Sequence, residues 1–381
     1  MQFLKNVMFF FIEPLFWGGL LMTFFSYQWR LRNERENFRI AIDRDFYEGR
    51  HFIKNGFTFL LIGAVFALIL GISLPSQTLM LYQLFAVIAL LFVNVGDLSL
   101  VALLLTGCVT LIFEQLKLAP SDFLAKHLLV SHTNDQFGGT ILLLTGLLAL
   151  FQGYLAHEDK TDWFSPQIFS GKRGRRIAGY TWREFTVFPL IMFIPGGAFG
   201  TNWQDWFDLS KYNTSLMIMP IFVGAFCRIY KQTPALALKL RRRQSLFLAG
   251  VSFILAGSAF VFPASSFYSL ALLLLVVIFQ AFGRLRADHE AKRWYVETSE
   301  GVRIVAVKPD TPAAKMKLEV GDIILECNGV RVTSGDELYE ALQKNSAYCR
   351  LKVKNFDGEL KLAESAIYAD SPHEIGLVLF E

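Results

Sequence analysis

Charged residues are scarce in this chain. Asp, Glu, Lys and Arg make up 18% of its 381 residues, whereas soluble globular domains carry about 25%. The net charge of +4 is too small to indicate a nucleic-acid partner. Apolar residues, in contrast, reach 53%, with 37 Phe, and the mean hydropathy is +0.39. The composition therefore indicates that lipid surrounds a large part of the chain.

Cysteine is also rare, and proline and glycine are not enriched. The four Cys contain no CxxC pair, so the sequence offers neither a disulfide framework nor a zinc site. The 12 Pro and 28 Gly are too few for a collagen-like or low-complexity protein.

The motifs of several enzyme classes are missing. A metalloprotease helix needs a second His four residues after the first, but Thr161, Arg293 and Leu377 occupy that position after the three His-Glu pairs. Ser258, in an apolar run, has no His or Lys at comparable depth to act as a base. No GxxxxGK[ST] phosphate loop occurs. We therefore predict no catalytic residues, no metal and no cofactor.

Long apolar runs dominate the first 283 residues, and each is about as long as a membrane-spanning helix requires. They predict a polytopic α-helical membrane protein with eight or nine spans, the count depending on whether Glu13-Pro14 makes the first run a re-entrant segment. The nine runs are Val7–Gln28, Phe57–Leu74, Leu79–Val95, Leu98–Leu116, Gly138–Ala156, Glu184–Gly200, Thr214–Tyr230, Ser245–Phe262 and Phe267–Gly283.

Lys and Arg alternate between rich and poor loops along the chain. Loops on the cytoplasmic side retain positive charge, and residues 29–56, 157–183 and 231–244 are the rich ones. A nine-span order places all three on one side with the C-terminal region, which we expect to be cytoplasmic. We divide the chain into a transmembrane domain (1–283), a basic juxtamembrane linker (284–293) and a water-soluble domain (294–381).

The C-terminal region has the pattern of a small β-rich α+β fold. Val302–Val307 and Ile323–Cys327 have strand composition, and Asn328-Gly329 is a hairpin turn signal. Acidic residues open a helix that runs to Gln343, as the helix dipole favours. A second hairpin turns at Asp357-Gly358.

The run TPAAKMKLEVGDIILECNGVRV, residues 311–332, resembles the bacterial PDZ signature SPAAxAGLxxGDxIxxxNGxxV. It departs at Asp310 and Lys317, where that family usually has Gly. The order of the elements implies a circularly permuted PDZ domain, whose last strand corresponds to the first strand of other members.

A PDZ domain binds an extended peptide beside a sheet edge and a helix, and a short loop captures the peptide carboxylate. The resemblance places this loop and strand at Ile375, Gly376, Leu377 and Val378. Leu338 and Leu342, four residues apart, are expected to form the other wall. Two alternatives stay open: these residues are simply core, or Trp294-Tyr295-Val296 is the binding edge.

A polytopic membrane half followed by one PDZ domain resembles the MinJ family of division-site proteins in rod-shaped Gram-positive bacteria. That resemblance implies a non-enzymatic adaptor in the cell membrane, enriched at septum and poles, that bridges DivIVA-like and MinD-like partners. The basic clusters at residues 172–176 and 239–243 could also contact anionic lipid. A protease regulator and a transporter with a regulatory PDZ domain are the alternatives; Pro195-Gly-Gly197 interrupts one run, but has no counterpart in the first half.

Overall fold

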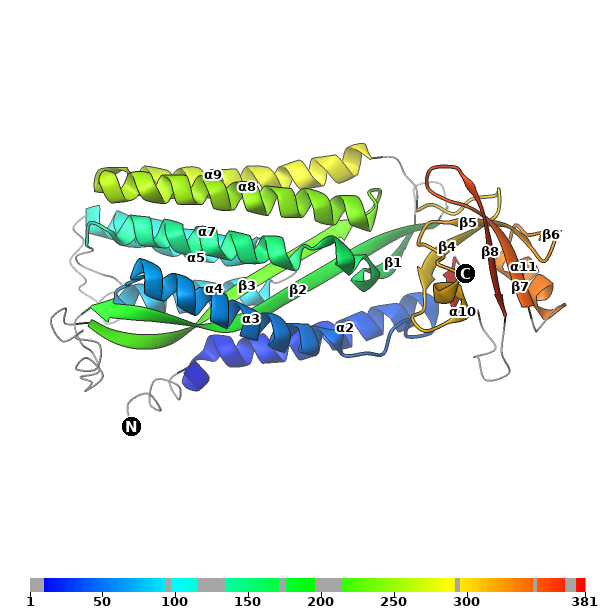
Figure 1. Cartoon of the computed structure of the whole chain (residues 1–381), viewed down its shortest axis with the longest axis horizontal. Coiled ribbons are helices and arrows are strands. Elements are labelled where there is room, and N and C mark those ends of the chain that lie inside the picture. Colours follow the sequence, from blue (N-terminus) through cyan, green and yellow to red (C-terminus); the bar gives the residue numbers. More distant parts are fainter. Residues whose placement is uncertain are drawn as a thin grey trace.

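The computed structural model describes residues 10–92, 97–115, 134–170, 176–195, 214–291, 295–344, 348–366 and 375–380. Figure 1 shows an elongated molecule in which an N-terminal helical region is followed, at one end, by a small β-rich C-terminal region. The N-terminal helices are α2 (Pro14–Phe38), α3 (Tyr47–Leu70), α4 (Ser76–Leu91), α5 (Leu98–Gln115), α7 (Phe137–Leu155), α8 (Pro234–Val261) and α9 (Ser266–Glu290), with the short 3₁₀ helices η1 (Glu158–Trp163) and η3 (Pro263–Ser265).

Five of the described helical segments are long and apolar enough to cross a membrane: α3, α5, α7, α8 and the segment η3–α9. Helix α4 is apolar but has only 16 residues. Helix α2 starts at Pro14, after Glu13, and its second half contains several charged residues. Helix α9 continues to Glu290, so most of the predicted linker at 284–293 is helical. The prediction of an N-terminal region with several long apolar helices is therefore confirmed, whereas its number of membrane passes stays a prediction.

Two of the nine predicted helices are wrong. The segments 184–200 and 214–230 were expected as spans six and seven, yet the described residues form strands β2 (Arg176–Pro195) and β3 (Thr214–Ile229). With β1 (Ser165–Ser170) they make an antiparallel sheet in the order β1-β2-β3. Figure 1 shows this hairpin running lengthwise among the helices.

Proline explains part of this difference. Pro189 lies opposite Pro220 in the ladder between β2 and β3. The carbonyl of Pro220 accepts a hydrogen bond from Gln83 on α4, so this residue directs its backbone polar groups away from β2. Because Pro189 is directly opposite in this antiparallel pair, its backbone polar groups also point away from the partner strand. Neither proline therefore costs a ladder bond, whereas each would break a bond inside a helix.

The outer edge of β3 is hydrogen-bonded by side chains of the surrounding helices. Backbone groups cannot remain unpaired in the hydrocarbon region, so an open sheet edge needs partners there. Gln152 donates to the carbonyl of Gly224 at 2.8 Å, and the amide of Gly224 donates to Ser99 at 3.3 Å. The amide of Phe222 donates to the hydroxyl of Tyr82 at 3.0 Å. These bonds let a strand replace a helix inside an apolar environment.

A buried ion cluster fixes the end of the helical region that faces the C-terminal region. Asp97 binds Arg241 of α8 at 2.7 Å and also pairs with Arg284 of α9. Arg241 is fully buried and donates to the carbonyl of Phe226 on β3 at 2.8 Å. One carboxylate thus joins α5, α8, α9 and the hairpin.

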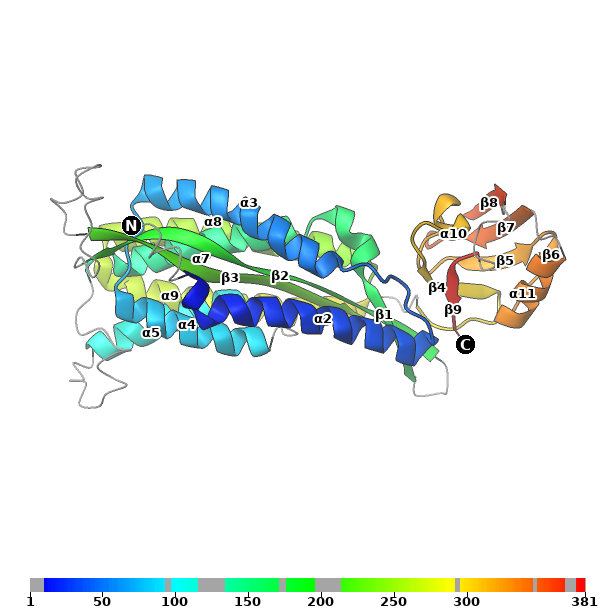
Figure 2. The same ribbon diagram turned by 90° about the horizontal axis from the view of Figure 1, so that it is seen from below.

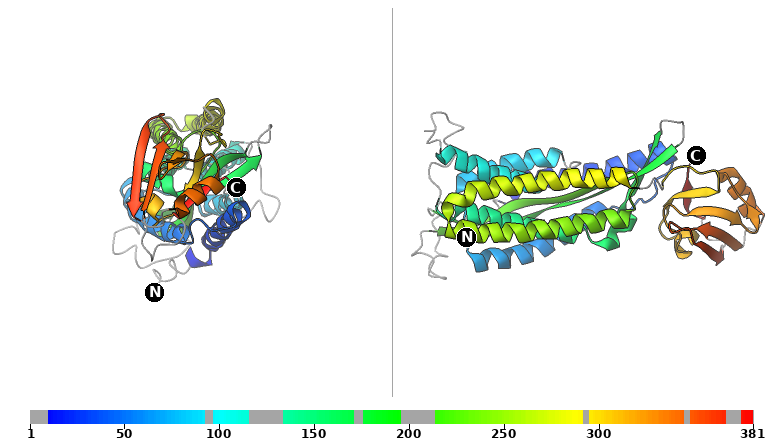
Figure 3. Two further views of the ribbon diagram at one scale, coloured as in Figure 1. Left: turned by 90° about the vertical axis from the view of Figure 1, so that its right-hand side faces the viewer. Right: turned by 90° about the horizontal axis from the view of Figure 1, so that it is seen from above.

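The C-terminal region is a sheet with two helices. Its strand order is β8-β7-β5-β4-β9, and β6 pairs with β5. Figure 3 shows these strands gathered at the far end of the molecule. The elements are β4 (Val302–Val307), α10 (Pro312–Lys315), β5 (Ile323–Cys327), β6 (Val330–Arg331), α11 (Gly335–Gln343), β7 (Tyr348–Lys354), β8 (Leu360–Ala366) and β9 (Leu377–Leu379).

The two regions touch through strand β2, which extends beyond the helices. Ile177 of β2 forms a bridge with Val296, and the amide of Ala178 donates to the carbonyl of Tyr295 at 2.9 Å. The hydroxyl of Tyr180 donates to the carbonyl of Val305 in β4 at 2.8 Å and is buried. The segment around Tyr295, one alternative for the binding edge, is therefore joined to β2 and not to the C-terminal sheet.

Candidate functional site

The two elements predicted to form the peptide groove, α11 and β9, lie close together, because a Cβ on Gly335 would lie 3.6 Å from a methyl group of Leu379. Strand β9 is an edge strand of the C-terminal sheet. Ser334 begins α11, and its hydroxyl accepts a hydrogen bond from the amide of Glu337 at 3.2 Å. The carboxylate of Glu337 accepts a hydrogen bond from the amide of Thr333 at 2.7 Å and another from the hydroxyl of the same residue. These bonds from Thr333 hold the pKa of Glu337 below its ordinary value. Such reciprocal capping fixes where the helix starts beside the strand.

Strand β9 divides its side chains between two hydrophobic clusters. Leu377 and Leu379 pack against the C-terminal core, which contains Leu338 of α11. Val378 packs in the other cluster, together with Tyr180 and Tyr295. Successive strand residues point to opposite faces, so one face of β9 is directed to α11 and the other to the N-terminal region (Figure 2).

Five of the six residues predicted from the sequence for the peptide site contribute to one place. Leu338 is buried in the core, Leu342 is half-buried against it, and Ile375 belongs to the same cluster. Leu377 is the fourth contributor to this cluster, and the Gly376 loop leads into the strand. The side chain of Val378 lies apart, although its backbone is in the edge strand. Their role in peptide binding stays a prediction.

Leu379 was missed by the sequence reasoning. It packs on the same side as Leu377, and the Cβ that a side chain at Gly335 would carry lies 3.6 Å from a methyl group of Leu379. The signal was present in the sequence, because Leu377 and Leu379 are two residues apart in a strand and must share a face.

Gly376 has a structural reason to be glycine. Its φ of +90° is strained for other residues, and a Cβ there would overlap the side chain of Thr311. Its carbonyl accepts from the amide of Lys308 at 2.8 Å, and the carbonyl of Ile375 accepts from Ala313 at 3.0 Å. The loop before β9 is thereby fastened to the start of α10.

The two departures from the PDZ signature keep the backbone conformation of glycine. Asp310 has a φ of 58° and Lys317 a φ of 53°. Both are in the left-handed region that glycine enters without penalty. The chain therefore preserves the turns of that signature with residues that hold them less favourably.

No arrangement for metal binding occurs in the described ranges. No group of three or more His, Cys, Asp or Glu residues is positioned there to hold an ion.

Comparisons with known proteins agree with this geometry. The family described as PDZ domain matches residues 303–355, from β4 through β7. A serine protease HTRA1 of Xenopus laevis is 42% identical over 62 residues, which is 16% of this chain and 14% of that protein. This similarity is limited to the PDZ part and does not extend to a protease domain.

Two relatives match far more of the chain. The cell division topological determinant MinJ of Bacillus subtilis (strain 168) is 24% identical over 389 residues, covering 99% of this chain and 94% of that protein. The probable cell division topological determinant MinJ of Lacticaseibacillus paracasei is 30% identical over 247 residues, covering 65% of this chain and 67% of that protein. The similarity to these relatives thus extends over both the helical region and the PDZ region of this chain, and the chain belongs to the MinJ family.

Proposed function

We propose that this chain is a non-enzymatic membrane scaffold that recruits partner proteins through the groove between α11 and β9. The observation that carries the proposal is that the two faces of β9 pack against different parts of the molecule. Its Val378 face packs against the N-terminal region, while Leu377 and Leu379 face the α11 side. A peptide can therefore add to the sheet edge without displacing the contact between the two regions.

The partners that fit the family are a DivIVA-like scaffold and a MinD-like ATPase, which the chain would bridge at the division site. The relatives are named as topological determinants of cell division. Confinement to the membrane restricts the groove to two dimensions and raises the effective concentration for partners that bind weakly alone. We place the protein in the cell membrane of a Gram-positive bacterium, enriched at septum and poles, with the PDZ domain in the cytoplasm. The proposed domains remain 1–283 and 294–381, joined by 284–293.

Basic clusters add a second, weaker membrane contact to this proposal. The cluster 172–176 lies outside the described residues, apart from Arg176. In the cluster 239–243, Arg241 is engaged with Asp97, whereas Lys239 and Arg243 are exposed. Each exposed cation near an anionic surface contributes about 1 kcal/mol. Among the described residues of the two clusters, Lys239 and Arg243 are therefore the exposed cations that would attract anionic lipid.

The test is a charge placed in the groove, Leu342→Glu, in the full chain with a C-terminal fluorescent tag on a flexible linker. Leu342 is only half-buried, so the substitution disturbs the fold less than Gly376→Asp, which would also overlap Thr311. The matched control is Leu360→Glu on β8, at the opposite edge of the sheet and 62% exposed.

We expect the wild type and Leu360→Glu to concentrate at septum and poles and to recruit tagged DivIVA-like and MinD-like proteins of the host. Leu342→Glu should remain in the membrane at equal abundance but lose one or both partners. Equal recruitment by both variants would reject the groove as the binding site. Uniform membrane fluorescence of the wild type, with normal cell length after deletion, would reject the role in division.

A further inference from the structure

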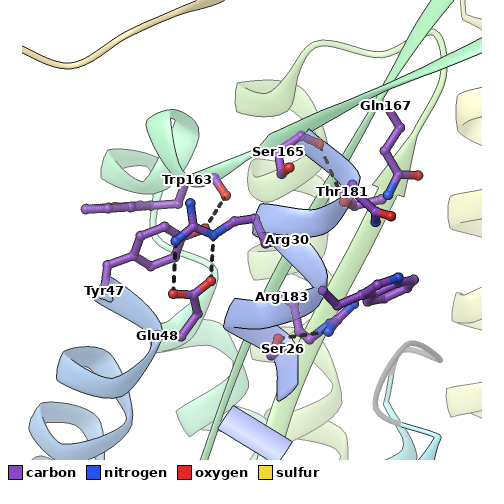
Figure 4. A pocket seen from close by; sticks show the side chains of 11 residues that line it. Ser26, Arg30, Tyr47, Glu48, Trp163, Ser165, Gln167, Thr181 and Arg183 are labelled. Atoms are coloured by element: carbon purple, nitrogen blue, oxygen red, sulfur yellow. Dashed lines mark hydrogen bonds and ion pairs between the residues drawn. The ribbon is translucent and has the colours of Figure 1, made fainter. Parts of the chain in front are cut away.

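A polar hollow between α2, α3, η1, β1 and β2 is filled with contacts among its own side chains. Glu48 binds Arg30 through hydrogen bonds of 2.7 and 3.2 Å, and Arg183 donates to Ser26 at 2.8 Å (Figure 4). These contacts join neighbouring elements and thus serve the fold. Strand β8 of the C-terminal sheet differs, because its outer edge has no strand partner among the described residues.

The outer edge of β8 offers backbone donors and acceptors in a regular pattern. The amide of Asn355 donates to the carbonyl of Glu359 at 3.0 Å, and this pair continues the register of the β7–β8 ladder. Hydrogen-bonded pairs alternate along an antiparallel ladder, so the odd-numbered residues of β8 direct their backbone groups to β7. The backbone groups of Leu360, Leu362 and Glu364 therefore point away from β7, to the open edge.

The same strand exposes two leucines. Leu360 is 62% exposed and Leu362 is 58% exposed, and they share a face because they are two residues apart. Their neighbours on β7, Lys354 and Lys352, form ion pairs within the chain. Native edge strands are usually protected by charged side chains or by a covering element. Two exposed leucines beside an unpaired edge are the opposite arrangement, and they indicate that another strand pairs with β8.

The edge of β8 faces sideways from the long axis of the molecule. Seen from the end in Figure 3, the C-terminal sheet has β8 at one side and β9 at the other. The helices long enough to cross a membrane follow the long axis, and β8 runs across it (Figure 1). A second copy in the same membrane would therefore present its own β8 at the same height. A twofold axis along the membrane normal would make the two strands antiparallel.

Antiparallel pairing of two β8 strands about Leu362 suits their sequence. Leu362 then lies opposite Leu362 of the second copy. Leu360 lies opposite Glu364, and Lys361 lies opposite Ala363. This alignment of residues 360–364 opposes no like charges, whereas pairing about Lys361 would set two lysines against each other, which is destabilising. The outward backbone groups of the two strands also meet at hydrogen-bonding positions.

We propose that the outer edge of β8 joins two copies of this chain in a dimer, through an antiparallel β8–β8 pair centred on Leu362. One strand of seven residues makes a small interface, and anchoring both copies in one membrane raises their effective concentration. Strand β9 is at the other edge of the sheet, so the dimer leaves it free. The dimer does not depend on the proposed function.

The first experiment measures self-association of the full chain in vesicles of phosphatidylethanolamine and phosphatidylglycerol. Copies with a donor or an acceptor fluorescent protein on a C-terminal linker are reconstituted together, and energy transfer is followed as lipid dilutes the protein. Leu362→Glu opposes two carboxylates at the twofold axis. Leu360→Glu faces Glu364 of the other copy, whereas Leu360→Lys offers that carboxylate an opposite charge. The matched control is Val330→Glu on β6, at a position 41% exposed.

We expect the wild type and Val330→Glu to associate equally. Leu362→Glu should weaken association about tenfold or more, because an apolar contact is lost and like charges meet. Leu360→Glu should also weaken it, and Leu360→Lys should weaken it less. Leu342→Glu, which changes the α11 side, should associate as the wild type does, so that loss of dimerisation is distinguishable from loss of partner recruitment.

The second experiment tests the alignment by oxidative cross-linking of cysteine variants in the same vesicles. Facing residues of a hydrogen-bonded antiparallel pair have Cα atoms about 5.5 Å apart, which suits a disulfide. Leu362→Cys should cross-link with itself, and Leu360→Cys should cross-link when mixed with Glu364→Cys. Leu360→Cys alone should not, because its two copies would lie four residues apart, or about 13 Å. The wild type, in which three of the four cysteines are buried, is the control.

Three results would overturn the proposal. A monomeric wild type at high density in vesicles would leave the β8 edge to water or to another protein. Equal energy transfer in Leu362→Glu and Val330→Glu would mean that a different surface joins the copies. Equal losses in Leu360→Glu and Leu360→Lys, with no cross-link at residue 362, would reject the pairing about Leu362.

Discussion

Two antiparallel hairpins, β2–β3 and β7–β8, have outer edges that meet different surroundings. In the C-terminal region, β7 and β8 pair along their whole length, and β8 exposes Leu360 and Leu362 by 62% and 58%. In the N-terminal region, the outer edge of β3 is bonded to Gln83, Gln152 and Tyr82 on neighbouring helices. Water can satisfy the first edge, but only side chains can satisfy the second. An apolar strand inside a helical bundle therefore depends on polar residues located in other elements.

The largest effect should come from the ion cluster that anchors the β3 hairpin. Asp97→Asn keeps a residue that tolerates the left-handed φ of 67° but removes the anion that faces two arginines. Breaking a buried pair costs about 3–5 kcal/mol. Thermal unfolding of the full chain in detergent, followed by tryptophan fluorescence, should show a strongly lowered midpoint.

Asp310→Asn is the matched control in the other region. Asp310 also has a positive φ, of 58°, but it is exposed. This variant should unfold close to the wild type. Similar losses in both variants would mean that the backbone conformation, and not the buried charge, causes the effect.

The second effect concerns the edge of β3 itself. Gln152→Leu introduces an apolar side chain of similar size but removes the amide that donates to the carbonyl of Gly224 at 2.8 Å. A buried carbonyl without a partner costs about 1–3 kcal/mol. The same unfolding measurement should show this loss in the free energy of unfolding.

Gln83→Leu provides the comparison. Gln83 donates to Pro220 at 3.2 Å, but its own carbonyl oxygen is buried without a partner. Removing both groups should cost less than Gln152→Leu. The reverse order would contradict the view that unpaired backbone groups set the stability of this hairpin.

The third effect belongs to the C-terminal region, where we expect the substitution to increase stability instead of lowering it. Lys317→Gly relieves a φ of 53°, and the left-handed conformation costs other residues about 1 kcal/mol. Hydrogen exchange of the β5 amides in the full chain should slow accordingly. Glu340→Gly, at an exposed position inside α11, should instead destabilise the helix by about 1 kcal/mol. Faster exchange in both would show that strain at residue 317 is negligible.

The smallest effect is a dependence on pH at the start of α11. The pKa of Glu337 is lowered by hydrogen bonds from Thr333, so the ionised form is favoured in the folded state. Its contribution is complete above the ordinary pKa of glutamate and disappears as the pH falls through the lowered value. Glu337→Gln should therefore accelerate exchange of the α11 amides at neutral pH, and its difference from the wild type should shrink in acid. A constant difference at all pH values would exclude the carboxylate as the cause.

Local turn chemistry made the C-terminal region predictable. Asn328 and Gly329 both have positive φ, as a tight hairpin turn requires, and β5 and α11 have the bounds expected from the sequence. The contact of Tyr180 with Val305 could not be foreseen, because it joins residues 125 positions apart. The proposed groove residues were predicted from a family pattern. Strand alternation already places Val378 on the face opposite Leu377, but the packing of that face on the N-terminal region could not be foreseen.

The β2–β3 hairpin was mispredicted because apolar runs of this length are longer than ordinary strands and favour a helix. Polar residues inside the apolar runs were considered only for chemical or transport roles, whereas the edge of β3 is held by amides and hydroxyls such as Gln152, Ser99 and Tyr82. Pro189 and Pro220 were the local sequence signal against helices. Opposite each other in the ladder, they are compatible with strands and unfavourable in two helices.

Strand β2 also determines where a partner can meet the groove. It is one unbroken strand of 20 residues, and at about 3.3 Å per residue it extends roughly 65 Å. One end lies among the membrane helices, and the other is bonded to Tyr295 and Val305. The proposed groove would thus be held at a fixed distance from the bilayer rather than on a flexible tether. A membrane-bound partner would then need a tail long enough to reach the groove. Partners would therefore be selected by the length of this tail as well as by the sequence of its peptide.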